Sequence, residues 1–186
     1  MKSIQQFIYV ILGIFLMNSA YAQQAEKTVY VGGAPMYPSK NIIENAMNSK
    51  DHTTLVAAIK AAGLVETLEG PGPFTVFAPT NEAFNRLPAG TVDMWLKPEN
   101  KDKLTSILTY HVVAGKWDAK SLGDVIMKGN GKAEIKTVQG GKIWAMMKGN
   151  KIMIKDETGI VATLSIEDIY QSNGVIFVID RVLMPK

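Results

Sequence analysis

The last third of the chain constrains its fold most strongly, because short strand-like runs alternate there with turn residues. Apolar runs bounded by Gly, Asn and Asp predict strands joined by tight turns. Asn173-Gly174 lies between the last two runs and favours the positive φ angles of a type I′ hairpin turn. The final run is apolar on both faces, which predicts a central strand. The predicted strands are residues 133–138, 142–147, 151–155, 160–164, 166–171 and 175–182.

The middle of the chain has helical spacing instead. Ser39 and Asp51 can N-cap two helices whose apolar side chains recur every three or four residues, and Gly63 can end the second. A short apolar strand ends at Pro79, and Thr80 can cap a further helix. Helices followed by antiparallel hairpins, in a chain without internal repeats, predict one α+β domain.

The N-terminus has the pattern of an export signal. Lys2 precedes an apolar run at residues 7–17, and Ala20 and Ala22 fit the small-x-small rule for cleavage after Ala22. The run is short for a membrane span, although an uncleaved anchor is the alternative. We therefore expect a secreted or periplasmic protein without stable membrane insertion. The predicted divisions are a signal peptide at 1–22, a leader or linker at 23–38 and one domain at 39–186.

Composition excludes several kinds of site. The chain has no cysteine, so it has neither disulfides nor a thiolate zinc site nor a cysteine nucleophile. Its formal net charge of +3 is far from the dense basic stripe of a nucleic-acid binder, so we expect no nucleic-acid partner. The hydrophobic fraction of 47% is enough for a packed core without disulfides.

Three segments together resemble a fasciclin (FAS1) domain: FTVFAPTNEAF at residues 74–84, YHVVAG at 110–115 and NGVIFVIDRVLMP at 173–185. The resemblance covers residues 39–186 and implies a wedge of antiparallel β-strands flanked by several short α-helices. It also implies an adhesion-type role. The motif residues are Phe74, Thr75, Val76, Phe77, Ala78, Pro79, Thr80, Asn81, Phe84, Tyr110, His111, Asn173, Gly174, Val175, Ile179 and Asp180.

The chain departs from the family pattern at three positions. Asn81 stands where the family usually has Asp, Ala114 where it has Pro, and Phe177 where it has His. Asn81 can still form local hydrogen bonds as a turn or cap residue. Phe177 predicts a more apolar core, and any function of that histidine in relatives does not transfer here.

Candidate catalytic and metal-binding residues are few. His111 could be a general base or metal ligand, but we favour a buried, hydrogen-bonded histidine at the join of a helix and a strand. His52 falls at a helix start, where we expect it to be exposed. The two histidines lack carboxylates at ligand spacing, and Met146, Met147 and Met153 are more typical of core filling than of soft-metal binding. We therefore expect no metal and no cofactor.

Two features are candidates for a contact surface. One is a set of lysines in the hairpin region, which could meet an acidic polysaccharide or a membrane surface, although a solvated sheet face that protects edge strands is the more common arrangement. The other is the sequence Glu167-Asp168-Ile169-Tyr170, because Asp168-Ile169 matches the core of an integrin-binding motif in adhesive animal relatives. Buried Ile169 and a turn-forming Asp168 are the structural alternative. The lysines are Lys128, Lys132, Lys136, Lys142, Lys148, Lys151 and Lys155.

These observations lead to one main functional hypothesis and two alternatives. The main hypothesis is an exported, non-catalytic module that binds a cell-surface or matrix protein or polysaccharide as a monomer or weak oligomer. The first alternative is a periplasmic carrier of a small ligand or metal, which requires a deep pocket. The second is a hydrolase that uses His111, which requires that side chain to be open to solvent beside a second polar group.

Overall fold

The computed structural model describes residues 28–186, so the signal peptide predicted at residues 1–22 lies outside the described part. The helices are α2 (Ile42–Ala46), α3 (Thr53–Ala62), α4 (Val65–Glu69), α5 (Asn81–Asn85), α6 (Thr91–Trp95), α7 (Lys101–Tyr110) and α8 (Ala119–Lys128), with short 3-10 turns at Lys50–His52 and Pro98–Asn100. The strands are β1 (Val29–Val31), β2 (Ala34–Met36), β3 (Phe74–Pro79), β4 (Val112–Ala114), β5 (Lys132–Lys136), β6 (Lys142–Lys148), β7 (Lys151–Lys155), β8 (Val161–Gln171) and β9 (Gly174–Ile179). None of the helices in residues 28–186 is long and apolar enough to span a membrane.

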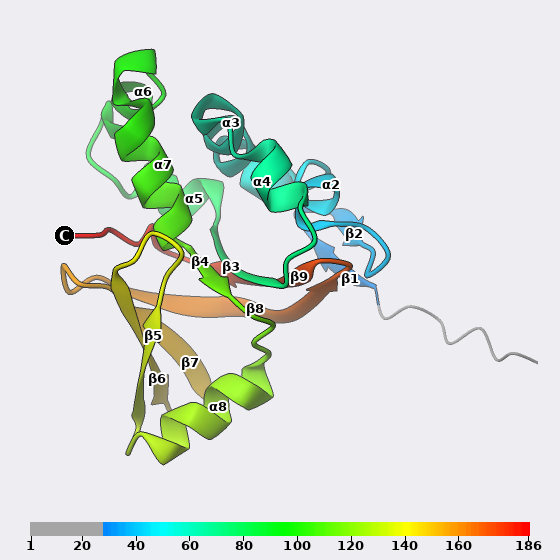
Figure 1. The fold of residues 1–186 in the computed structure, drawn as a ribbon, viewed down its shortest axis with the longest axis vertical. Coiled ribbons are helices and arrows are strands. Elements are labelled where there is room, and N and C mark those ends of the chain that lie inside the picture. The colour runs from blue at the N-terminus through cyan, green and yellow to red at the C-terminus, as the bar shows by residue number, and fades with distance from the viewer. Residues whose placement is uncertain (1–27) are drawn as a thin grey trace, which may run out of the picture.

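Seven strands form one sheet in the order β4-β3-β9-β8-β7-β6-β5 (Figure 1). All neighbours are antiparallel except β3 and β9, which run parallel from Phe74↔Gly174 to Pro79↔Ile179. The Val138 N–H, just after β5, donates to the Val112 carbonyl of β4 at 2.7 Å, so the two ends of the sheet meet. The predicted α+β wedge is confirmed, and the parallel β3–β9 pair is a feature that the sequence did not indicate.

The two sides of the curved sheet bury separate cores. Helices α2 to α7 lie on one side of the sheet in Figure 1, and α8 lies on the other. Strand β9 contributes to both cores: Ile176 and Val178 pack toward the helices α2 to α7, while Val175, Phe177 and Ile179 pack toward α8. All six β9 residues are buried, which confirms the predicted central strand. The Phe177 ring stacks on Phe77 with centroids 5.7 Å apart, so an apolar ring does fill this core position.

The turn between β8 and β9 differs from the prediction. Gln171 pairs with Gly174, so the two turn residues are Ser172 and Asn173, and neither Asn173 nor Gly174 has a positive φ angle. The Asn173 side chain instead accepts a hydrogen bond from the Ile42 N–H at 3.0 Å. Gly174 is required for a different reason: a Cβ there would lie 2.1 Å from the Phe74 carbonyl oxygen of the adjacent parallel strand.

Two predicted helix caps are wrong and two are confirmed. Asn41, rather than Ser39, caps α2, because its side chain accepts the Glu44 N–H and the Glu44 side chain accepts the Asn41 N–H. The residue that precedes α3 is His52 rather than Asp51, which lies within a 3-10 turn. Gly63 ends α3 with φ 72°, and Thr80 caps α5 by accepting the Ala83 N–H at 3.2 Å.

Two elements go beyond the predicted pattern. Residues 29–36, within the expected leader or linker, form the β1–β2 hairpin, and its Val31 and Met36 are buried in the core beneath α2 to α7. Helix α8 was not predicted, and it starts with a capping box in which the Asp118 carboxylate accepts the Ser121 N–H at 2.7 Å. The packed part of the described chain thus starts at the β1–β2 hairpin.

Candidate functional site

His111 is buried between two backbone groups. Its Nδ1 lies 2.8 Å from the Ile107 carbonyl oxygen, and its Nε2 accepts the Leu183 N–H at 2.9 Å. Because a carbonyl only accepts, Nδ1 carries the proton and the ring is neutral. Burial lowers the pKa of His111 to about 4, against smaller opposing effects of the Ile107 carbonyl and the charge of Asp156. Both ring nitrogens are therefore occupied, and His111 ties α7 to the C-terminal segment.

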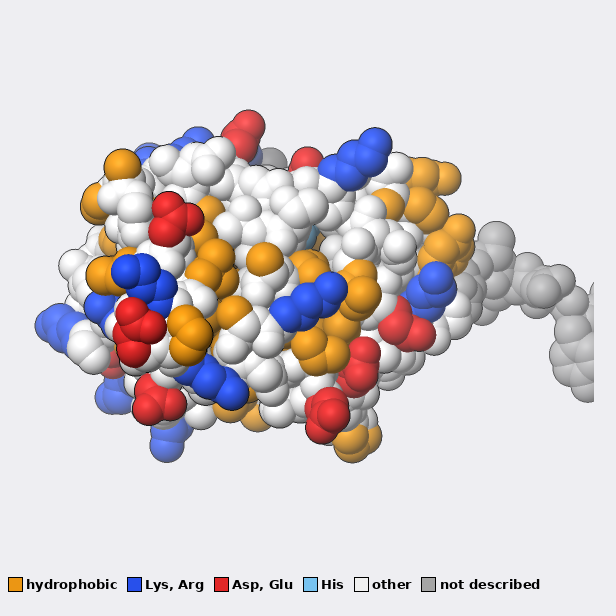
Figure 2. Space-filling view, turned by 90° about the horizontal axis from the view of Figure 1, so that it is seen from above, with side chains coloured by type: hydrophobic (Ala, Val, Ile, Leu, Met, Phe, Trp, Pro, Cys, Tyr) orange, Lys and Arg blue, Asp and Glu red, His pale blue; other side chains and the backbone are white. Residues whose placement is uncertain are grey.

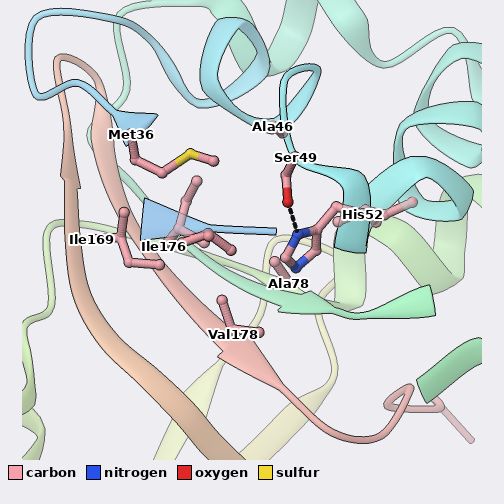
Figure 3. Close-up of a pocket in the computed structure, with 10 residues that line it drawn as sticks. Met36, Ala46, Ser49, His52, Ala78, Ile169, Ile176 and Val178 are labelled. Carbon is pink, nitrogen blue, oxygen red and sulfur yellow. Dashed lines mark hydrogen bonds between the residues drawn. The ribbon is translucent and has the colours of Figure 1, made fainter. Parts of the chain in front are cut away.

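His52 is buried rather than exposed, which corrects the expectation from sequence. It is only 4% exposed, and it lines a small pocket beneath the β1–β2 hairpin, where the Ser49 hydroxyl lies 2.9 Å from its Nδ1 (Figure 3). Among residues 28–186, its Nε2 finds no hydrogen-bond partner. Burial lowers the pKa of His52, with smaller opposing effects of the Ala78 backbone and Asp51. The Ser49–His52 pair thus lies inside the protein.

The pocket beside His52 is too small for an organic ligand. Its volume is about 20 Å³, roughly that of one water molecule. Apart from Ser49 and His52 its walls are apolar, and they include Met36, Ile169 and Ile176 (Figure 3). In residues 28–186 there is also no group of three His, Asp or Glu side chains that could hold a metal ion.

The sequence motifs mainly hold loops together. The Asn81 Oδ1 accepts the Thr54 N–H at 3.0 Å while its Nδ2 donates to the Lys50 carbonyl at 2.8 Å, so the side chain joins the starts of α3 and α5. The Thr75 hydroxyl donates to the Gly115 carbonyl at 2.8 Å. The Asp180 carboxylate accepts the Thr163 N–H at 2.7 Å and lies 3.5 Å from the Arg86 guanidinium.

The Glu167–Tyr170 segment is divided between core and surface. Ile169 is 1% exposed and packs in the core beneath α2 to α7. Asp168 has φ 56°, a left-handed conformation, and its Oδ1 accepts the Ala119 N–H at the start of α8 at 2.7 Å. Glu167 and Tyr170 are half-buried. Burial, followed by the nearby charge of Asp168, raises the pKa of Glu167.

Six of the seven lysines in the hairpin region share one face of the sheet. Strand register places them on the side away from α8, because the alternate residues Ala145 and Ile154 face inward. Lys128 is the exception and lies in the last turn of α8. We call this surface the outer face. It consists of Lys132, Glu134, Lys136, Lys142, Trp144, Met146, Lys148, Lys151, Met153, Lys155, Val161 and Thr163.

The outer face combines a basic surround with a half-buried apolar centre. Met146 and Met153 are directly opposite each other on β6 and β7, and Trp144 lies on the same face; all three are half-buried. Glu134 is the one acidic residue of the outer face, and its carboxylate lies 2.9 Å from the Lys142 ammonium. The Lys132 ammonium lies 4.8 Å from the Trp144 ring centroid, which fixes one charge over the apolar centre.

Two pairs of lysines face each other across strands. Lys148 is opposite Lys151, and Lys136 is opposite Lys142. A hollow of about 400 Å³ lies beside the first pair, lined by Lys148, Asn150, Lys151, Met153 and Thr163. The helical side of the molecule is different, because basic and acidic side chains are interspersed on it (Figure 2).

The lysines of the outer face were expected from the sequence, whereas Trp144, Asn150 and Thr163 were not. The signal was present in the alternation of residues 142–148, which places Lys, Trp, Met and Lys on one face. The alternation does not show which face is open to solvent. That follows from the packing of α8 against the opposite face of the sheet.

Comparison with known proteins gives consistent matches. The Fasciclin domain model matches residues 50–185. Protein sll1483 of Synechocystis sp. is 44% identical over 94% of this chain and 89% of its own length. Immunogenic protein MPB70 of Mycobacterium bovis is 39% identical over 75% of this chain and 66% of its own. Transforming growth factor-beta-induced protein ig-h3 of Sus scrofa is 36% identical over 80% of this chain, which spans only 20% of that protein.

A solved structure shares the fold. It is a FAS1 domain pair from the insect cell adhesion molecule Fasciclin I, with a TM-score of 0.69 over 80% of this chain and 52% of that one. The sequence identity is 17%, so this likeness concerns the fold alone.

Proposed function

Because the chain belongs to the fasciclin family, we propose that it is an exported, non-catalytic binding module that contacts a cell-surface or matrix component. The observation that carries the proposal is the outer face of β5 to β8. It presents lysines around half-buried Trp144, Met146 and Met153 on a rigid sheet. A basic surface around a partly exposed apolar centre is suited to a binding partner of opposite charge.

The relatives support a binding role in general terms. One structural neighbour comes from an insect cell adhesion molecule, which supports adhesion here by analogy of fold. For this chain, the buried His111 argues against the hydrolase alternative, because both ring nitrogens already bond to backbone groups. The pocket beside His52 has room for about one water molecule, so it is not the deep pocket that a carrier of organic ligands requires.

The proposal is tested by measuring retention of the purified protein on whole cells and envelope fractions of the producing organism. We expect saturable retention that a variant with Lys148 and Lys151 changed to Gln weakens. A variant with Asp168 changed to Ala tests the Glu167–Tyr170 segment and is expected to bind as the wild type does. Retention no greater than that of an unrelated protein of similar charge, on every fraction, would refute the proposed function.

A further inference from the structure

We propose that the outer face binds a linear acidic polysaccharide through its carboxylates, and that the hollow beside Lys148 and Lys151 takes one of the charged sugars. This inference rests on the proposed function and specifies the partner of the same surface. It depends on the cross-strand lysine pairs, the dimensions of the face and the kind of cation that it presents.

The lysine pairs cost stability in the free protein. Like charges directly opposite each other on neighbouring strands are destabilising, and Lys148↔Lys151 and Lys136↔Lys142 are both of this kind. The charge of Lys142 is partly compensated by the Glu134 carboxylate, which lies 2.9 Å from its ammonium group. Among the residues that line the hollow beside Lys148 and Lys151, none is acidic. An anion bound there would relieve the repulsion and would bind more tightly for that reason.

The face fits an extended polymer better than a single small anion. Lys142 and Lys148 are at opposite ends of β6, and at about 3.3 Å per residue the face is roughly 20 Å long. Four strands at about 4.8 Å spacing make it roughly 14 Å wide. Lysines lie at both ends of the face, on β5, β6 and β7, so several charges of one polysaccharide chain could be contacted at once.

The residues favour carboxylated sugars over nucleic acid. All six cations of the outer face are lysines, which act as point charges and offer no planar fork for the bidentate contacts that an arginine makes with phosphate or carboxylate. Trp144 is half-buried beneath the Lys132 ammonium, so its ring is not presented for stacking with a base. Asn150 and Thr163 add a carboxamide and a hydroxyl to the hollow, groups suited to sugar hydroxyls.

The same residues argue against a membrane as the partner. Proteins that dock on a bilayer present apolar side chains that enter the headgroup region. On the outer face the three large apolar side chains, Trp144, Met146 and Met153, are only partly exposed and lie between longer lysines. A soluble polyanion can meet such a surface without insertion.

The test is the affinity of the purified full chain for polygalacturonate fragments, measured by titration calorimetry at two salt concentrations, with neutral dextran as the matched uncharged polymer. We expect binding to polygalacturonate alone, with an affinity that falls steeply as salt rises. K148Q/K151Q should weaken binding by about tenfold or more, because it removes the charges beside the hollow. The control K60Q/K103Q removes two exposed lysines from α3 and α7 and should change affinity by less than about twofold. Circular dichroism of both variants confirms that they are folded.

Four outcomes would overturn the inference. They are no binding to polygalacturonate, equal weakening by both double variants, equal affinity for double-stranded DNA, and binding to anionic lipid vesicles in place of the polysaccharide. If cells still retain the protein while polygalacturonate neither binds nor competes, the proposed function stands and this inference fails. If cells do not retain it, the proposed function itself fails.

Discussion

At the scale of single residues, the side chains that look most reactive in the sequence have structural roles. His111 joins the Ile107 carbonyl to the Leu183 N–H, and Asp168 accepts the first N–H of α8. Sequence could predict that His111 was buried, because apolar residues follow it. It could not predict the burial of His52, which depends on the distant β1–β2 hairpin.

The buried His111 makes stability depend on pH. Its folded pKa of about 4 lies below the unfolded value of 6.5, so the unfolded chain takes up the proton first as pH falls. Stability is therefore lost progressively below about pH 6.5, by about 2–3 kcal/mol between pH 7.5 and pH 4.5. His52, whose pKa is also lowered by burial, adds to the loss. Urea unfolding at pH 7.5 and pH 4.5 measures this change in the free energy of unfolding.

The matched variant for this measurement is H111Q. It should be less stable than the wild type at pH 7.5, because the two backbone hydrogen bonds are disturbed. Between pH 7.5 and pH 4.5, the free energy of unfolding of H111Q should fall by about 2 kcal/mol less than that of the wild type. The same loss in both proteins would show that His111 does not titrate in this way.

Asp168 is expected to act on stability rather than on binding. D168A removes the acceptor for the Ala119 N–H and places an alanine in the left-handed conformation of residue 168. We therefore expect the free energy of unfolding to fall by about 1–2 kcal/mol. D168N keeps an acceptor and tolerates that conformation, so its loss should be smaller. Thermal and urea unfolding of the two variants give the comparison. A stable D168A that no longer binds cells would instead make Asp168 a contact residue.

At the scale of elements, the hydrophobic pattern indicated most strands but not how distant ones pair. Strands β3 and β9 are about 100 residues apart in sequence, and their parallel register depends on non-local packing. Residues 160–164 and 166–171 were expected as two runs and form one strand, β8, with register irregularities on either side of Ile166. Helix α8 could have been predicted, because Leu122, Val125 and Ile126 recur at helical spacing, and Gly123 is the residue that argues against a helix there.

Asn173 links three elements through one buried side chain. Its Nδ2 donates to the Leu68 and Gly70 carbonyls, both at 2.8 Å, and its Oδ1 accepts the Ile42 N–H, so one side chain joins α2, α4 and the β8–β9 turn. N173A should destabilise the protein by about 2–4 kcal/mol, because buried backbone groups lose their partners. The matched control is S172A at the exposed neighbouring turn residue, expected within about 0.5 kcal/mol of the wild type. Similar urea midpoints for N173A and S172A would contradict this role.

At the scale of the whole molecule, charge is distributed unevenly. The outer face carries six lysines against one glutamate, a net charge of +5, so the remaining residues carry −2 of the chain's net +3. The net charge of the whole chain therefore hides a basic face. Its composition could be read from strand alternation in the sequence, but its exposure follows from the position of α8 on the opposite side of the sheet.

The central claim is that partners bind to the outer face, and amide chemical-shift mapping tests it most directly. Isotope-labelled protein is titrated with polygalacturonate fragments and, separately, with solubilised envelope material. We predict shifts concentrated on β6 and β7, with the largest at residues 148–153 and near Thr163, and little change in α3 and α7. Shifts centred on residues 167–170 or on the helical side would contradict the account, as would an unchanged spectrum at saturating envelope material.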